Sequence, residues 1–237
     1  MKWQKFSIIV ISILILTVFI ENGLPRNKPP FIDPQIVSGE KSTYKVIEGG
    51  KGFQAFYIIT RARNNAGDVY IIRSESYEMI LERSNLRPIS VKKRNSDGEL
   101  EFSIEYNNDR VHFIYPGPKR NKVEKVPKDR YDVNTIIEVV RGFPFGKKKA
   151  KFTLVTADHI IGAYIHVTGE ERIKVPVGDF DCYKLEAGIA GLKGRIIKTK
   201  FYFWIEKIFP HRLIKYTDSD GKRLMSLISY EVLKESK

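Results

Sequence analysis

The sequence predicts a mainly β domain, a β-rich α+β fold in which antiparallel strands carry one amphipathic helix. The chain is 42% hydrophobic and 12% aromatic, and it is rich in the branched and aromatic residues that favour strands. Apolar runs of strand length recur between turns made of Gly, Pro, Asn and Asp. Residues 196–205 also alternate, with Phe201 and Phe203 on one face and Lys200 and Tyr202 on the other, which is typical of a half-buried strand.

Length, charge and cysteine content limit the class of protein further. A chain of 237 residues has room for one domain with a sizeable core and a targeting segment. The single cysteine, Cys182, excludes an intramolecular disulfide, and its apolar strand predicts a buried, inert thiol. The 41 Lys and Arg against 28 Asp and Glu give a formal net charge of +13, which attracts anions. Solubility and protection of sheet edges explain these lysines more simply than a specific anion site.

The N-terminus predicts export. Lys2 and Lys5 precede an apolar run at residues 6–20, the pattern of a secretory signal with an apolar region of about 15 residues. No small-x-small cleavage site follows, so residues 1–23 form either a signal peptide or an uncleaved anchor in the inner membrane. Either way the domain is expected in the periplasm or cell envelope. The proline-rich residues 24–35 predict an extended linker, and residues 36–235 a single domain.

Strand candidates fill most of this domain, separated by turns such as Gly49-Gly50 and Ser96-Asp97-Gly98. Residues 172–219 contain further strands divided at Pro176, Gly188 and Pro210. Outside that stretch, the expected strands are 39–46, 52–63, 69–76, 77–82, 88–94, 100–106, 111–115, 152–155, 163–168 and 224–233.

One helix is expected, at about residues 131–141. Val133, Ile136, Ile137 and Val140 have the i, i+3, i+4, i+7 spacing of an apolar helical stripe, which would pack on the sheet. Arg141-Gly142-Phe143-Pro144 ends it. The preceding residues 116–130 are polar and basic and contain three prolines, so they predict a surface loop.

No motif in the sequence predicts catalysis, a metal site or a cofactor. The four histidines, His112, His159, His166 and His211, lack metal-ligand spacing, and each is more simply structural. The sequence has no nucleophile elbow, P-loop or dinucleotide fingerprint. Lysines interleaved with aromatics at 198–204 are also found on surfaces that bind single-stranded nucleic acid, but the export signal argues against nucleic acid as a partner. We therefore expect a protein that is not an enzyme, with an uncharacterised hydrolase as the least favoured alternative.

Four segments carry a resemblance to a known family. VPVGDFDCYKLE at 175–186 and FYFWIEKIFPHRLIKY at 201–216 resemble the bacterial domain-of-unknown-function family 3108, a group of exported envelope proteins. SYEMILERSNLRPISVKKR at 76–94 and GEKSTYKV at 39–46 extend the resemblance over most of the domain. The resemblance implies a strongly curved antiparallel sheet or half-open β-barrel with one helix, similar to periplasmic lipoprotein carriers. It implies no catalytic residue.

These observations favour a non-enzymatic envelope domain that binds a lipid or other apolar ligand in the concave face of the sheet. The same apolar residues would equally well fill a solid core. The alternative is a membrane-tethered structural or adaptor domain that binds an envelope protein or an anionic glycan. The residues expected to line a cavity are Phe201, Phe203, Ile205, Tyr183, Leu185, Val133, Ile136 and Ile137. The residues expected to contact an anionic head group or envelope surface are Lys119, Arg120, Lys147, Lys148 and Lys149.

Overall fold

A single curved sheet forms the framework of the molecule. The computed structural model describes residues 29–117, 121–147, 149–156, 159–191, 194 and 198–234. In this part of the chain, fifteen strands pair in the order β8-β7-β6-β5-β4-β3-β2-β1-β15-β14-β13-β12-β11-β10-β9. Their bounds are β1 Glu40–Glu48, β2 Lys51–Asn64, β3 Gly67–Arg73, β4 Tyr77–Glu82, β5 Pro88–Arg94, β6 Leu100–Asn107, β7 Arg110–Ile114, β8 Lys122–Lys125, β9 Arg130–Asp132, β10 Lys149–Val155, β11 Ile160–Val175, β12 Gly178–Ile189, β13 Phe201–Glu206, β14 Leu213–Asp218 and β15 Arg223–Val232.

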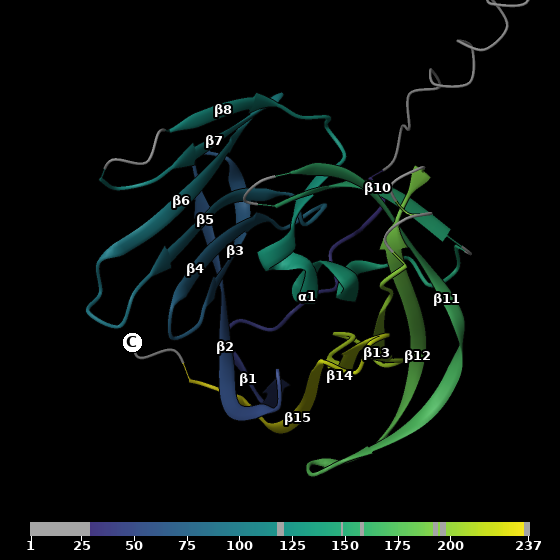
Figure 1. The fold of residues 1–237 in the computed structure, drawn as a ribbon. Helices are drawn as coiled ribbons and strands as arrows, with labels where there is room; N and C mark the ends of the chain where they lie inside the picture. The colour runs from purple at the N-terminus through teal and green to yellow at the C-terminus, as the bar shows by residue number, and fades with distance from the viewer. Residues whose placement is uncertain are drawn as a thin grey trace, which may run out of the picture.

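The sheet is two meanders joined through the first and last strands. β1 pairs antiparallel with β2 on one side and with β15 on the other, so the two ends of the domain meet in the middle of the sheet. All neighbours are antiparallel except β9 and β10, which run parallel. The sheet curves around the short helix α1 without closing into a barrel (Figure 1). The prediction of a mainly β, curved antiparallel sheet with one helix is confirmed.

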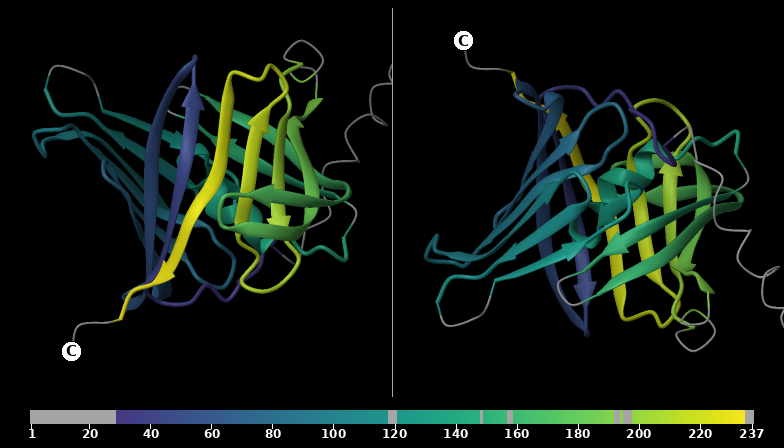
Figure 2. Two further views of the ribbon diagram at one scale, coloured as in Figure 1. Left: turned by 90° about the horizontal axis from the view of Figure 1, so that it is seen from below. Right: turned by 90° about the horizontal axis from the view of Figure 1, so that it is seen from above.

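The two ends of this half-barrel differ. The β1–β2 and β14–β15 hairpins lie at one end, as Figure 2 shows in its left panel. The turn from β13 to β14, the last residues of β15 and the chain before β1 lie at the opposite end. The cavity described below opens at the hairpin end.

The helix is shorter than predicted. Tyr131 and Asp132 belong to β9, where Tyr131 pairs with Leu154, and helical structure begins at Val133. Asp132 caps this start, because its Oδ1 accepts a hydrogen bond from the Asn134 amide at 2.7 Å. A 3-10 turn at Val133–Thr135, the helix α1 at Ile136–Val139 and a second 3-10 turn at Val140–Gly142 follow one another. At Gly142 any Cβ would collide with the carbonyl oxygen of Ile32, so only glycine fits there.

Two segments that were expected to be irregular belong to the fold. Within the predicted loop 116–130, β8 pairs with β7, and Val126 is buried beyond it. Residues 29–35, expected as an extended linker, pack on the domain instead. Phe31 is fully buried, with its ring 4.8 Å from that of Tyr131 and 5.2 Å from that of Phe152.

The strands that carry the family resemblance also differ in their limits. β13 begins at Phe201, whereas a strand was expected from residue 196; residues 195–197 lie outside the described part. The expected strand at 163–168 belongs to the single long strand β11, and a bulge between Val167 and Gly169 separates its halves.

Candidate binding cavity

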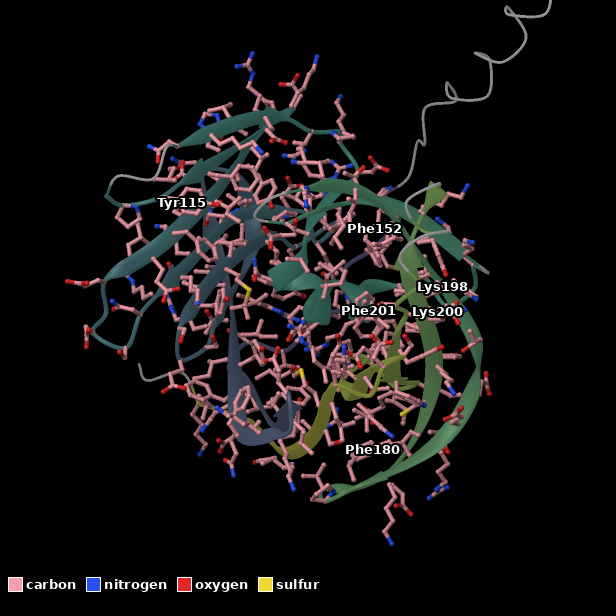
Figure 3. The ribbon with its side chains drawn as sticks, viewed as in Figure 1. Tyr115, Phe152, Phe180, Lys198, Lys200 and Phe201 are labelled. Atoms are coloured by element: carbon pink, nitrogen blue, oxygen red, sulfur yellow. The ribbon has the colours of Figure 1, made fainter. Side chains whose placement is uncertain are left out.

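A cavity of about 510 Å³ lies inside the curve of the sheet, beside α1. Its wall is mostly apolar and comes from both halves of the sheet and from the helix. The residues that line it are Val46, Glu48, Phe53, Ala55, Tyr57, Tyr77, Met79, Val133, Asn134, Ile136, Ile137, Phe152, Leu154, Ala163, Ala187, Gly188, Ile189, Phe201, Phe203, Tyr216, Arg223 and Met225. In Figure 3, Phe152 and Phe201 lie in the interior of the half-barrel, on the side of β10 and β13. A cavity of this size lies within the range typical of small-molecule sites.

Aromatic rings form one side of the cavity. The rings of Phe201 and Tyr216 lie nearly parallel with centroids 6.4 Å apart, and Phe203 lies 5.1 Å from Tyr216. Tyr57 stands on the opposite wall, on β2, and burial together with the charge of Glu138 raises its pKa to about 12. The Tyr57 phenol is therefore neutral at physiological pH, and this wall carries no charge.

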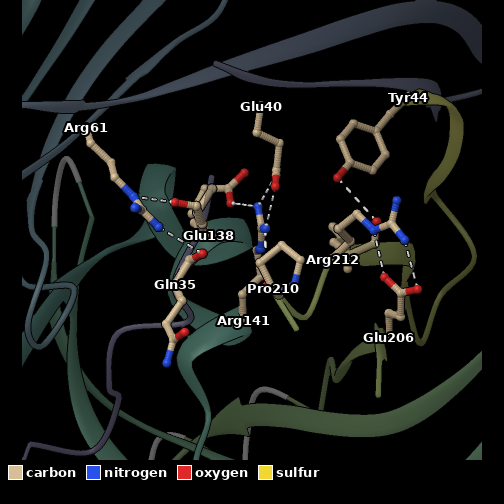
Figure 4. Close-up of polar contacts among 11 residues, drawn as sticks. Gln35, Glu40, Tyr44, Arg61, Glu138, Arg141, Glu206, Pro210 and Arg212 are labelled. Carbon is tan, nitrogen blue, oxygen red and sulfur yellow. Dashed lines mark hydrogen bonds and ion pairs between the residues drawn. The ribbon is translucent and has the colours of Figure 1, made fainter. Parts of the chain in front are cut away.

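The helix closes one end of the cavity and turns two different faces to its surroundings. Ile136 and Ile137 face the cavity, whereas Glu138 and Arg141 are buried away from it. Arg141 donates from Nη1 to Glu40 Oε1 and to Glu138 Oε2, both at 2.7 Å, and from Nη2 to Glu40 Oε2 at 3.1 Å (Figure 4). It also donates to the Pro210 carbonyl at 3.2 Å. One guanidinium thus ties the helix to β1 and to the turn between β13 and β14.

The charges of this buried cluster influence one another. Burial raises the pKa of Glu138, and Glu40 adds to that effect while Arg141 opposes it. Burial disfavours the charge on Arg141, but Glu138 and Glu40 outweigh it and raise the pKa of Arg141. The guanidinium therefore stays charged and holds two carboxylates inside the protein. The sequence analysis missed this cluster because Arg141 was interpreted only as part of the helix stop.

A second buried contact fixes the start of the helix. Asp132 Oδ2 accepts a hydrogen bond from the Tyr106 hydroxyl at 2.5 Å, while its Oδ1 caps the helix. Burial raises the pKa of Asp132, against the effect of these hydrogen bonds. Because Tyr106 belongs to β6 and Asp132 to β9, this contact joins the two halves of the sheet across the interior.

Five of the eight residues predicted to line a cavity do so: Val133, Ile136, Ile137, Phe201 and Phe203. The other three lie toward the closed end, among the residues that pack near the helical segment. Leu185 and Ile205 are fully buried, and Tyr183 stacks on Phe145 with ring centroids 4.3 Å apart. Their strand face was predicted correctly. Tyr183 and Ile205 are cross-strand partners two residues further from the hairpin end than Phe203, whereas Leu185, the partner of Phe203, is fully buried beside it.

None of the predicted cation contacts within the described residues lines this cavity. Lys147 and Lys149 border a second, more open hollow of about 560 Å³, together with Phe145, His166 and Val167. The Lys149 Nζ lies 4.3 Å from the centre of the Tyr164 ring. Lys149 lies three positions before Phe152, so its side chain is on the opposite face of β10 from the cavity. Lys119, Arg120 and Lys148 lie outside the described residues.

Several wall residues were missed by the sequence analysis, and some of them had a signal. Phe53, Ala55 and Tyr57 alternate along β2 and all line the cavity. Glu48 and Arg223 gave no apolar signal because they are charged, yet they lie at the exposed end of the wall. We call this end the cavity mouth.

The family model for DUF3108, a protein family of unknown function, matches residues 39–228. The chain belongs to this family. The resemblance predicted from the sequence is therefore confirmed. No curated protein sequence matches the chain closely enough to count as a relative.

Three solved structures are similar to this DUF3108 chain. A β-barrel-like DUF1849 protein from Brucella abortus is 11% identical, with 84% of this chain and 100% of that chain covered and a TM-score of 0.50. A proposed exported protein with a YmcC-like fold from Bacteroides fragilis is 11% identical over 85% and 99% of the two chains, with a TM-score of 0.32. A proposed lipoprotein from Parabacteroides distasonis is 14% identical over 86% and 100%, with a TM-score of 0.34. The first of these likenesses supports the fold, and the fold alone.

The described residues form neither a metal-binding cluster nor a membrane-spanning helix. Within them, His, Cys, Asp and Glu side chains form no group of three that could hold a metal ion. Nor does any helix in the described ranges have the length and apolarity needed to cross a membrane. Cys182 is buried, and burial raises the pKa of its thiol to about 12, so it is a poor nucleophile.

Proposed function

We propose that this DUF3108 protein is an exported envelope protein that binds a lipid or acyl chain in the cavity, without catalysing a reaction. The observation that carries the proposal is the cavity itself. Wall positions that a solid core would fill instead border about 510 Å³ of space, and most of them are apolar. Side chains packed into this space would stabilise the fold, so a function that uses the cavity is the simplest explanation for a wall that leaves it open.

The structure divides the interior into a packed part and a hollow part. At the closed end, Leu185 and Ile205 are fully buried, as in a solid core. Toward the hairpin end, the wall residues Phe53, Glu48 and Arg223 are exposed, so a ligand has a route into the cavity. The signal-like segment at residues 6–20 supports an envelope location, where acyl chains are abundant.

Native mass spectrometry of the full chain, released from a bacterial envelope with a mild detergent, tests the proposal. A stoichiometric acyl species on the native protein, recovered by organic extraction, is the expected result. The variant Ala55→Phe, which adds a ring inside the cavity, should lose that species. Gln54→Phe adds the same ring at the exposed neighbouring position and should retain it. A ligand-free mass that envelope lipids do not change would contradict the proposal.

A second function, an adaptor that docks on an envelope protein, is favoured by one observation. The large apolar side chains of Ile208 and Phe209 are 72% and 57% exposed, and they are neighbours on the turn between β13 and β14. That turn is held from within, because Arg141 donates to the Pro210 carbonyl and Arg212 binds both carboxylate oxygens of Glu206, at 2.6 and 2.8 Å. Apolar side chains held so rigidly in solvent are typical of a contact surface.

Site-specific photocross-linking in cells tests the adaptor function. A photoreactive residue in place of Phe209 should give one discrete adduct with an envelope protein. The same residue in place of Val123, which is 51% exposed on β8, is the control and should give none. Equal labelling from both positions would show that Phe209 makes no specific contact.

A further inference from the structure

The cavity mouth carries charge, although the rest of the wall is apolar or neutral. Among the described residues that line the cavity, Glu48 and Arg223 are the charged ones. Glu48 Oε1 lies 2.7 Å from Arg223 Nη2, and the two side chains are 48% and 58% exposed. An ion pair at the entrance of an apolar cavity suggests a role in selecting what enters, and this inference rests on the function proposed above.

Both side chains belong to the concave face of the sheet. Glu48 follows Tyr44 and Val46 in the inward phase of β1, and both of these residues are buried. Arg223 precedes Met225 and Leu227 in the inward phase of β15, and these two are buried as well. Glu48 and Arg223 are direct cross-strand partners, so the pair lies where the inner face of the sheet reaches solvent.

The backbone at Arg223 is fixed by its neighbours. Asp218, which is 8% exposed, accepts hydrogen bonds at Oδ1 from the amides of Lys222 at 2.8 Å and Arg223 at 3.3 Å. Thr217 Oγ1 donates to the Arg223 carbonyl at 2.9 Å. Arg223 therefore stands on a rigid turn at the mouth, so less entropy is lost when its side chain binds a ligand.

Local charge at the mouth favours an anion. Lys51 is the partner of Glu48 in the register of β1 and β2, so Glu48 stands between Lys51 and Arg223. Of these exposed side chains two are cations and one is a carboxylate, while the Asp218 carboxylate is buried and accepts hydrogen bonds from the amides of Lys222 and Arg223. Since Glu48 and Arg223 are both about half exposed, their ion pair is weak and can exchange for another at little cost.

We propose that Arg223 binds the anionic end group, a carboxylate or a phosphate, of a single-chain amphiphile whose tail occupies the cavity. The planar guanidinium offers two parallel N–H donors, the geometry that matches two oxygens of such a group. Glu48 pairs with Arg223 in the free protein, and the anionic group of the ligand replaces Glu48 as the partner of Arg223. Glu48 thereby competes with the ligand, and acyl chains that lack an acidic end gain nothing at this position.

Equilibrium binding of labelled hexadecanoic acid and hexadecan-1-ol to the full-length protein tests this subsite. The two ligands share a tail and differ in charge. Arg223→Gln should weaken binding of the acid by roughly five- to tenfold and leave binding of the alcohol unchanged. Glu48→Gln should strengthen binding of the acid. Arg63→Gln, which changes an arginine in the exposed Arg63–Asp68 pair on β2 and β3, is the matched control and should change neither.

The outcomes separate this inference from the function on which it rests. Equal affinity for acid and alcohol, unaffected by Arg223→Gln, would overturn the anion subsite and leave the cavity function intact. If neither ligand binds, the cavity function falls and the subsite with it. Dodecyl phosphate should compete with the acid and inorganic phosphate alone should not, because the tail is needed. Competition by inorganic phosphate at similar concentrations would overturn the proposed amphiphile.

Discussion

The buried cluster around Arg141 should be the most sensitive point of the fold. Arg141→Met keeps a long apolar side chain but leaves Glu40 and Glu138 without their shared cation. All three side chains are at most 3% exposed, so solvent cannot replace the lost charge. Removing one partner of a buried ion pair costs about 3–5 kcal/mol. Against the ordinary free energy of unfolding of a domain, about 5–15 kcal/mol, that is a large share.

Urea denaturation measures this loss, and its pH dependence identifies the cause. In the folded variant Glu138 is buried without a cation, so its pKa lies further above the ordinary value than in the native protein. A raised carboxyl pKa means that the folded state holds a proton that the unfolded state releases, so stability falls as pH rises above about 4.5. The deficit of Arg141→Met should therefore be smaller near about pH 5 than near about pH 8.

A matched control removes the same charge from the surface. Arg63 pairs with Asp68 at 3.2 Å, but their side chains are 81% and 55% exposed. Arg63→Met should change stability by no more than about 0.5 kcal/mol. A deficit for Arg141→Met below about 1 kcal/mol, or one that is equal at both pH values, would refute the reasoning, because neither result fits an unpaired buried carboxylate.

Three further predictions follow from buried groups. Glu138→Gln should flatten the pH dependence of stability above about pH 4.5, because the native Glu138 pKa is raised; titration of the urea midpoint checks this, and an unchanged slope would count against it. Phe31→Ala should destabilise the domain by about 3–5 kcal/mol, since its fully buried ring packs on Tyr131 and Phe152; thermal unfolding measures it, and a loss under about 1 kcal/mol would mean that residues 29–35 are dispensable. Cys182 should resist thiol reagents near about pH 8 and react on unfolding, because burial raises its pKa to about 12; rapid native labelling would contradict this.

The strands that were predicted most accurately from the sequence are those with clear turn residues at their ends. β4 and β5 agree with the predicted ranges at both ends, because the break at 83–87 separates two clear apolar runs. The strand predicted at 69–76 ends earlier, at Arg73. β8 and β9 were missed because their pairing depends on partners elsewhere in the sheet and leaves no local pattern. β8 has the sequence KVEK, in which Val123 remains 51% exposed. β9 has the sequence RYD, which carries no strand periodicity of its own.

For the cavity wall, the sequence could predict only which face of a strand each residue lies on. Alternation placed Phe203 and Ile205 on the same inward side of β13, and both are buried. It could not say that Phe203 borders the cavity whereas Ile205, two residues further along β13, is fully buried outside the wall. That difference depends on contacts between elements far apart in the chain, such as those of Arg141 with Glu40 and Pro210.

These contacts bear on a question that composition left open, whether the inward apolar residues fill a solid core or border a cavity. The inner face of β1 runs from Glu40, buried against Arg141, through Tyr44 and Val46 to Glu48 at the mouth. At the Glu40 end the helix satisfies the carboxylate, and the interior is packed. At the Glu48 end no helix covers the sheet in the described structure, and the wall is open. The inner face therefore packs as a core at one height and borders the cavity at another, and the buried Arg141 cluster lies at the packed end.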